Sequence, residues 1–178
     1  MNIDFQLVLL ALGACYVVAA SVLWLKRRGR MREFAAAHGL RFRGTLPSDK
    51  YDPYRRFPRV QSSVLLYSAM EGRWEDFETA LFDYYFIRGR LSTGVIMSLP
   101  TDSSSVIIRP GAAPDGVGPR TAAQLAQDPS VYLETSAGYL FASPRRKLDV
   151  DALREFLAFA ASLARALEAD AKAAGQGQ

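Results

Sequence analysis

A single carboxylate is the first residue in this sequence that could carry chemistry. Asp83 lies in the aromatic segment 81–86, LFDYYF, where a carboxyl group held among rings could act as a general acid or base. Strand alternation places Asp83 on the face opposite Phe82 and Tyr84. The simpler interpretation is a buried Asp paired with an arginine or a backbone amide, because no second catalytic group can be identified. Asp83 is therefore a weak catalytic candidate.

A proline-rich segment, residues 47–59, is the second candidate region and is expected to be an extended loop. Aromatic rings suit a membrane interface and guanidinium groups bind phosphate, so the segment could bind a ligand or lipid. The residues concerned are Tyr54, Arg55, Arg56 and Arg59. The alternative is a loop whose aromatic side chains pack against the core while its arginines are solvated.

Other common kinds of catalytic, metal and cofactor site lack the residues or motifs that they require. His38 is the sole histidine and Cys15 the sole cysteine, which excludes a histidine cluster, a cysteine-based structural metal site and an intrachain disulfide. No nucleotide-binding glycine motif or nucleophile elbow occurs. We expect no metal or cofactor, and a helix-end role for His38.

Charge is concentrated in one short segment, which we call the basic cluster: Lys26, Arg27, Arg28, Arg30 and Arg32. The chain has 22 basic and 18 acidic residues, and the basic cluster with Asp4 accounts for the whole net charge of +4. The rest of the chain is balanced and lacks the basic surface that nucleic-acid binding needs. We therefore expect no nucleic-acid partner.

An uncharged apolar segment, residues 5–25, precedes the basic cluster. As a helix it would span about 31 Å, the thickness of a bilayer's hydrocarbon core, with Trp24 at the headgroup boundary. A cleaved signal peptide would need a basic N-terminus and a shorter apolar core. A lipobox-like LGAC sequence ends at Cys15, but cleavage there would leave ten nonionic, mostly apolar residues at the new N-terminus. These features predict a transmembrane helix.

The position of the basic cluster predicts the topology of the chain. Positive charges flanking a membrane helix stay in the cytoplasm, and here they all follow the helix. Residues 1–4 are expected outside, residues 26–39 as a basic juxtamembrane helix ending at Gly39, and residues 40–170 as a cytoplasmic domain. The Arg-rich, Ala-rich composition is typical of a GC-rich bacterial genome. In a bacterium, a membrane helix followed by a cytoplasmic domain would lie in the inner membrane. Membrane lipids are the expected partners.

The domain is predicted to be α+β, with a mainly antiparallel sheet packed by a C-terminal amphipathic helix. The expected strands are 62–74, 77–89, 91–99, 105–109, 131–135 and 139–143, with a short helix at 121–127. From Leu153 to Leu167 apolar residues recur with helical spacing. Asp149 is expected to cap this helix, and residues 171–178 to form a disordered tail.

Several short motifs resemble a group of bacterial proteins that carry one N-terminal membrane helix and a soluble α+β domain. They are AAHGLRF (36–42), the segment 72–84 ending in LFDY, IRP (108–110) and AGYL (137–140). The resemblance implies anchoring and architecture and no activity. We therefore expect a membrane-tethered binding or scaffolding module with an unidentified protein partner. The alternative is a membrane-anchored enzyme with a carboxylate site around Asp83.

Overall fold

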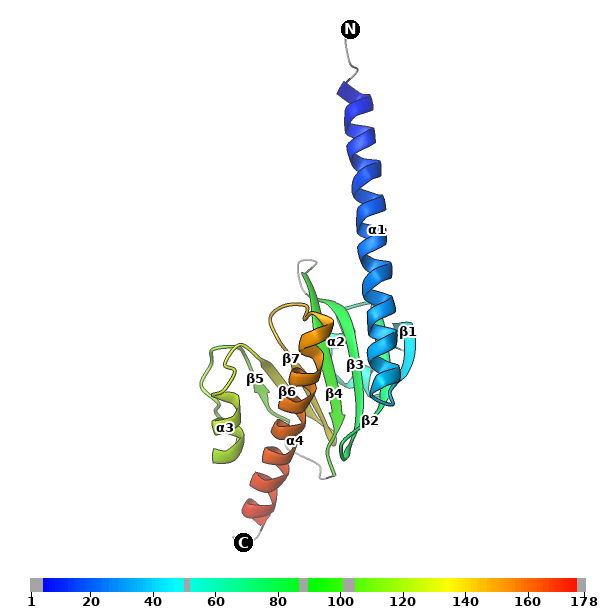
Figure 1. Ribbon diagram of the computed structural model, residues 1–178. Helices are drawn as coiled ribbons and strands as arrows, with labels where there is room; N and C mark the ends of the chain where they lie inside the picture. The colour runs from blue at the N-terminus through cyan, green and yellow to red at the C-terminus, as the bar shows by residue number, and fades with distance from the viewer. Residues whose placement is uncertain (1–4, 50–51, 87–89, 101–104, 176–178) are drawn as a thin grey trace.

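The computed structural model describes residues 5–49, 52–86, 90–100 and 105–175. One long N-terminal helix extends well beyond an α+β domain and rests its C-terminal end on that domain (Figure 1). The predicted fold class is confirmed. The expected outer residues 1–4 and the last three residues of the expected tail lie outside the described residues.

Helix α1 (Phe5–Ala37) is continuous through the apolar segment and the basic cluster. Its end is a Schellman motif, because the Leu40 N–H donates to the Ala35 carbonyl at 2.8 Å while Gly39 adopts a φ of 70°. Glycine at that position carries no Cβ penalty, so the chain turns sharply into the first strand.

A seven-stranded sheet follows, in the order β1-β2-β3-β4-β7-β6-β5, with every pairing antiparallel. The strands are β1 (Arg41–Pro47), β2 (Leu65–Trp74), β3 (Phe77–Phe86), β4 (Arg90–Ser98), β5 (Ile107–Ile108), β6 (Tyr132–Ser136) and β7 (Tyr139–Ser143). The expected strands 62–74 and 77–89 correspond to the hairpin of β2 and β3, and the expected strands 131–135 and 139–143 correspond to the hairpin of β6 and β7. Ala137 and Gly138 both have positive φ, as a tight hairpin turn requires.

Strand β1 was not among the expected strands. Its pairing with β2 is interrupted by register shifts on both sides of Gly44, whose φ is 83°. Such a bulge breaks the period-two pattern by which strands are found in a sequence. The strand therefore had no clear sequence signal.

The helices lie on both faces of the sheet. Helix α4 (Leu153–Gly175) and the end of α1 cover one face, with α3 (Pro119–Leu125) beside α4 (Figure 1). The other face is covered by the 3₁₀ turn η1 (Tyr54–Arg56) and the short helix α2 (Pro58–Gln61), where an extended loop was expected. A second 3₁₀ turn, η2 (Val150–Ala152), leads into α4.

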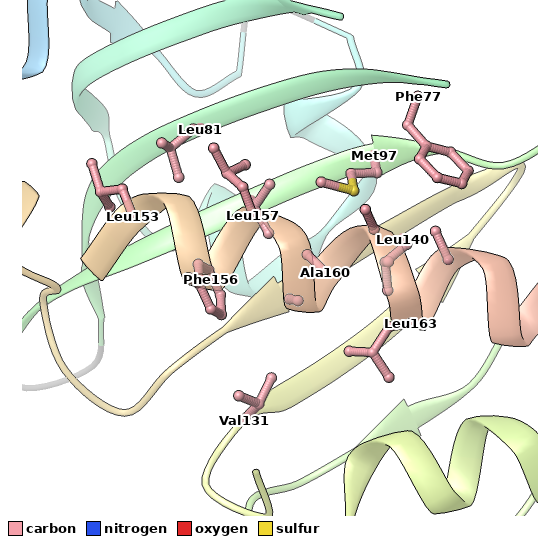
Figure 2. Packing of buried hydrophobic residues seen from close by; sticks show 14 of the residues in the cluster. Phe77, Leu81, Met97, Val131, Leu140, Leu153, Phe156, Leu157, Ala160 and Leu163 are labelled. Atoms are coloured by element: carbon pink, nitrogen blue, oxygen red, sulfur yellow. The ribbon is translucent and has the colours of Figure 1, made fainter. Parts of the chain in front are cut away.

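Two hydrophobic clusters occupy the two faces. On the first, Leu153, Leu157 and Ala160 of α4 point toward Leu81 and Met97 of the sheet (Figure 2). This cluster also contains Met31 and Ala35 of α1, which are fully or almost fully buried. The second cluster gathers the rings of Tyr54, Phe57, Phe82, Tyr84 and Phe141. Alternation along β3 therefore separates Phe82 and Tyr84 from Asp83, as predicted.

Two details of the C-terminal region differ from expectation. Asp149 makes no capping hydrogen bond with its side chain, because the chain first forms η2 and α4 starts only at Leu153. The capping prediction for Asp149 was wrong. Helix α4 also continues to Gly175, beyond the expected boundary at residue 170, with helix-forming alanines in its last turns.

Candidate functional site at the junction of helix and sheet

Arg27 of the basic cluster forms a bidentate ion pair with Asp83 of β3. Its Nε donates to Oδ2 at 2.7 Å and its Nη2 to Oδ1 at 2.9 Å. The side chains are 12% and 2% exposed, so the pair is almost fully removed from water. Paired guanidinium and carboxylate groups form strong, directional hydrogen bonds. This contact joins the basic part of helix α1 to strand β3 of the sheet.

The ion pair belongs to a closed ring of hydrogen bonds. Thr93 donates from its hydroxyl to Asp83 Oδ1 at 2.9 Å and accepts from the Leu148 N–H at 3.0 Å. Arg27 closes the ring by donating from Nη1 to the Leu148 carbonyl at 2.7 Å. Four segments meet here: α1, β3, β4 and the chain between β7 and η2. The carboxylate accepts three hydrogen bonds within the protein, an arrangement typical of a structural acid.

The other residues of the basic cluster differ in their contacts. Arg30 binds Asp151 at 2.7 Å in an exposed pair. The guanidinium of Arg28 lies 5.2 Å from the centre of the Trp24 ring, and that of Arg32 lies 5.6 Å from the ring of Phe42. Lys26 is exposed. Arg27 and Arg30 therefore both form ion pairs with the domain, and of the two pairs only that of Arg27 is buried.

A cavity of about 280 Å³ lies where α1 leaves the sheet, and we call it the junction cavity. Helix α1 contributes one wall, and the ion pair of Arg27 and Asp83 is also part of its lining. Tyr67 and Tyr85 are stacked edge to face at 5.5 Å between ring centres. The lining residues are Ala20, Leu23, Trp24, Arg27, Tyr67, Ser68, Asp83, Tyr85, Leu91 and Lys147. The cavity is thus largely apolar, with Lys147 as an exposed cation.

The structure places the second set of candidate residues on the opposite face of the sheet. Tyr54 is completely buried and donates to Glu71 Oε1 at 2.9 Å. Arg55 and Arg56 both bind Asp52. Arg59 donates to the Tyr84 hydroxyl at 3.2 Å. The structure therefore does not bring these residues together with Asp83, and their side chains have partners inside the domain.

Two polar networks in this second face were missed from the sequence. In the first, the Tyr84 hydroxyl lies 2.9 Å from that of Ser143, which lies 3.2 Å from that of Ser92. In the second, Tyr132 donates to Glu134 Oε2 at 2.8 Å, and Arg59 lies 4.0 Å above the Tyr132 ring.

The second network contains a buried acid. Desolvation raises the pKa of the Glu134 carboxyl, against the hydrogen bond from Tyr132 and the charge of Arg59. Both networks join residues distant in sequence, so only the alternation of Tyr132 and Glu134 on one strand face could have hinted at them. Within the described part of the chain, no three His, Cys, Asp or Glu side chains are grouped to hold a metal ion.

The comparison with solved structures identifies a protein of similar fold. It is the mycobacterial trehalose monomycolate transport factor A, TtfA. The TM-score is 0.56 at 14% sequence identity, over 79% of this chain and 93% of the TtfA chain. No protein-family model and no curated protein sequence matches the chain. At this identity the likeness to TtfA concerns the fold.

Proposed function

We propose that this protein is a single-pass tether whose α+β domain acts as a non-enzymatic binding module on the cytoplasmic face of the bacterial inner membrane. Its role is that of an accessory factor for lipid-like molecules or for a membrane protein that handles them. The observation that carries the proposal is the buried pair of Arg27 and Asp83, which makes the membrane helix a part of the domain's own fold.

The exposure of α1 supports the assignment of a membrane span. Residues 6–25 are all exposed, and the helix has an apolar window of mean hydropathy 2.3 with none of it buried. Exposed apolar surface of this extent requires a lipid or protein environment. The same helix then enters the domain, where Met31 and Ala35 are buried. A tether that ends inside the core favours a permanent anchor over a cleaved signal.

The distribution of exposed residues supports one end of the sheet as the membrane-facing end. The end where α1 departs carries the exposed cations Arg90, Arg145, Arg146 and Lys147. Val64, Leu65 and Tyr85 are 81%, 38% and 46% exposed at the same end. The opposite end holds the β2–β3 turn with Glu75, Asp76 and Glu78. Cations and apolar side chains favour an anionic leaflet, and carboxylates favour the aqueous side.

The contacts of Asp83 support a binding role over catalysis. Asp83 lies in the lining of the junction cavity, but it is 2% exposed and both of its carboxylate oxygens already accept hydrogen bonds from Arg27 or Thr93, which leaves neither oxygen free to take a proton from a substrate. The fold of TtfA supports the accessory role, since that protein is described as a trehalose monomycolate transport factor. We extend to this chain only the general class of that role, the handling of lipid-like molecules.

Photocrosslinking in living cells tests this proposal on the full chain. A photoreactive residue at Val64 should give adducts with lipid or with an integral membrane protein. The same residue at Asp76, whose side chain is 81% exposed at the far end, is the matched control and should give neither. Equal adducts with soluble proteins from both positions would contradict the proposed placement.

A further inference from the structure

We propose that the junction cavity binds the headgroup end of one anionic phospholipid from the cytoplasmic leaflet. The inference rests on the proposed function, because it requires α1 to lie in the bilayer. It adds a specific ligand class and a specific site.

The position of the cavity along α1 selects a lipid as its occupant. Ala20 lies five positions before Leu25, the last residue of the apolar segment 5–25, which corresponds to about 7.5 Å of helix. Ala20 and Leu23 therefore lie at the inner edge of the hydrocarbon layer, and Trp24 lies at the headgroup boundary. Acyl chains fill this layer wherever protein does not. A cavity with Ala20 and Leu23 in its wall therefore opens to phospholipid.

The charges of the lining select an anionic headgroup. Arg27 and Asp83 neutralise each other, and each of the three guanidinium nitrogens of Arg27 already donates within the ring. Lys147 is exposed and forms no ion pair among the described residues. The net charge of the lining is therefore +1. A phosphate near Lys147, with its acyl chain along Leu23, would satisfy both the charge and the apolar wall.

The backbone conformation at Ser68 supports the interpretation of the junction cavity as a binding site. Ser68 is 6% exposed, lines the cavity and has a φ of 50°, a conformation that residues other than glycine rarely adopt. The β2–β3 pairing shifts register between Tyr67 and Met70, so a bulge lies here. Bulges re-aim side chains and are frequent beside binding sites. This bulge lies next to Tyr67, whose ring packs edge to face against that of Tyr85 in the lining of the cavity.

The experiment uses the full chain, reconstituted in vesicles of phosphatidylethanolamine and phosphatidylglycerol and then extracted in mild detergent. Native mass spectrometry identifies the retained lipid. We expect one phosphatidylglycerol on the wild-type protein, and about fivefold less retention in Lys147→Gln. Lys172→Gln removes one exposed cation near the far end of α4 and should retain lipid like wild type (Figure 1).

A second pair of variants tests the cavity volume. Ala20→Phe places a ring in the cavity and should abolish retention, while Val18→Phe, about 200° away around the helix, should not. A parallel arm adds inorganic phosphate without lipid, and no bound phosphate is expected.

The inference would be overturned by no retained lipid, by retention unchanged in both Lys147→Gln and Ala20→Phe, or by binding of free phosphate alone. Adducts of a photoreactive residue at Tyr85 with protein and never with lipid would also overturn it. Fractionation of the same variants separates the two proposals. If the chain pellets with membranes and binds no lipid, the lipid site fails and the tether stands.

Discussion

Arg27 and Asp83, 56 residues apart, meet in a bidentate contact with distances of 2.7 and 2.9 Å. One residue belongs to helix α1, whose residues 6–25 are exposed, and the other to strand β3 inside the sheet. The contact therefore fixes the direction in which the helix leaves the domain. A flexible linker would let the helix and the domain move independently, whereas this contact holds them in one relative orientation.

Breaking this pair should destabilise the domain. Asp83→Asn or Arg27→Gln leaves a buried, unpaired partner, and each should lower the free energy of unfolding by about 3 kcal/mol. The double variant should lose less than the sum, because its two polar groups are both neutral. Unfolding of the full chain in detergent micelles measures all three.

The exposed pair of Arg30 and Asp151 is the control for the buried pair. Its side chains are 51% and 84% exposed, so Arg30→Gln should leave the free energy of unfolding almost unchanged. Equal losses of unfolding free energy in Arg27→Gln and Arg30→Gln would contradict the prediction that the buried pair stabilises the domain more than the exposed pair does.

Two glycines offer a matched test of packing. A Cβ at Gly94 would lie 2.8 Å from a ring carbon of Phe141 and 3.0 Å from one of Phe82. Gly94→Ala should therefore destabilise the domain by about 2 kcal/mol through overpacking. Gly29 in α1 has no atom within 4 Å of such a Cβ, so Gly29→Ala should stabilise the helix by up to about 1 kcal/mol. Thermal unfolding compares them, and equal effects would contradict the packing of the second face.

Glu134 should make the free energy of unfolding depend on pH, and the substitution Glu134→Gln should remove that dependence. Desolvation raises its pKa in the folded state above the ordinary value of 4.5, so the folded protein binds the proton more tightly. Stability from this group is full below pH 4.5 and falls as the pH rises through the folded pKa. Glu134→Gln should equal wild type near pH 4 and be more stable by up to about 1 kcal/mol at pH 7. If the stability of Glu134→Gln fell more steeply with rising pH than that of wild type, the pKa of Glu134 would not be raised by folding and this prediction would be wrong.

Asp170 should show the opposite dependence. Desolvation opposes ionisation, yet hydrogen bonds from the Thr121 N–H and hydroxyl and from the Arg120 N–H lower the pKa of its carboxyl. Its contribution is present above the ordinary value of 3.8 and is lost as the pH falls through the folded value.

Asp170→Asn should therefore cost about 1 kcal/mol at pH 7 and less below pH 3.8. Hydrogen exchange of α3 should report the same loss locally, because Asp170 holds the start of that helix. Protection of α3 that is identical in wild type and variant would exclude this capping role.

The sequence specified the elements whose patterns are local. The face of α4 from Leu153 to Ala164 follows helical spacing, and it is buried as expected. The turn at Ala137-Gly138 is equally local. Gly39 likewise ended the first helix at the expected position.

The remaining features depend on tertiary contacts. The bulge at Gly44 hid β1, because it interrupts the alternation of a strand. Alternation placed Asp83 on its face, but nothing local indicated that Arg27 would be its partner. The junction cavity was equally hidden, since α1, β2, β3, β4 and the segment before η2 all contribute to it.

The most direct test of the central claim is the location and orientation of the domain in cells. The full chain with Cys15→Ser and Lys172→Cys carries one thiol near the end of α4, in place of the exposed Cys15. We predict that this chain pellets with membranes, resists carbonate extraction and reacts with an impermeant maleimide only after spheroplasts are permeabilised. A freely soluble chain, or labelling of intact spheroplasts, would contradict the account.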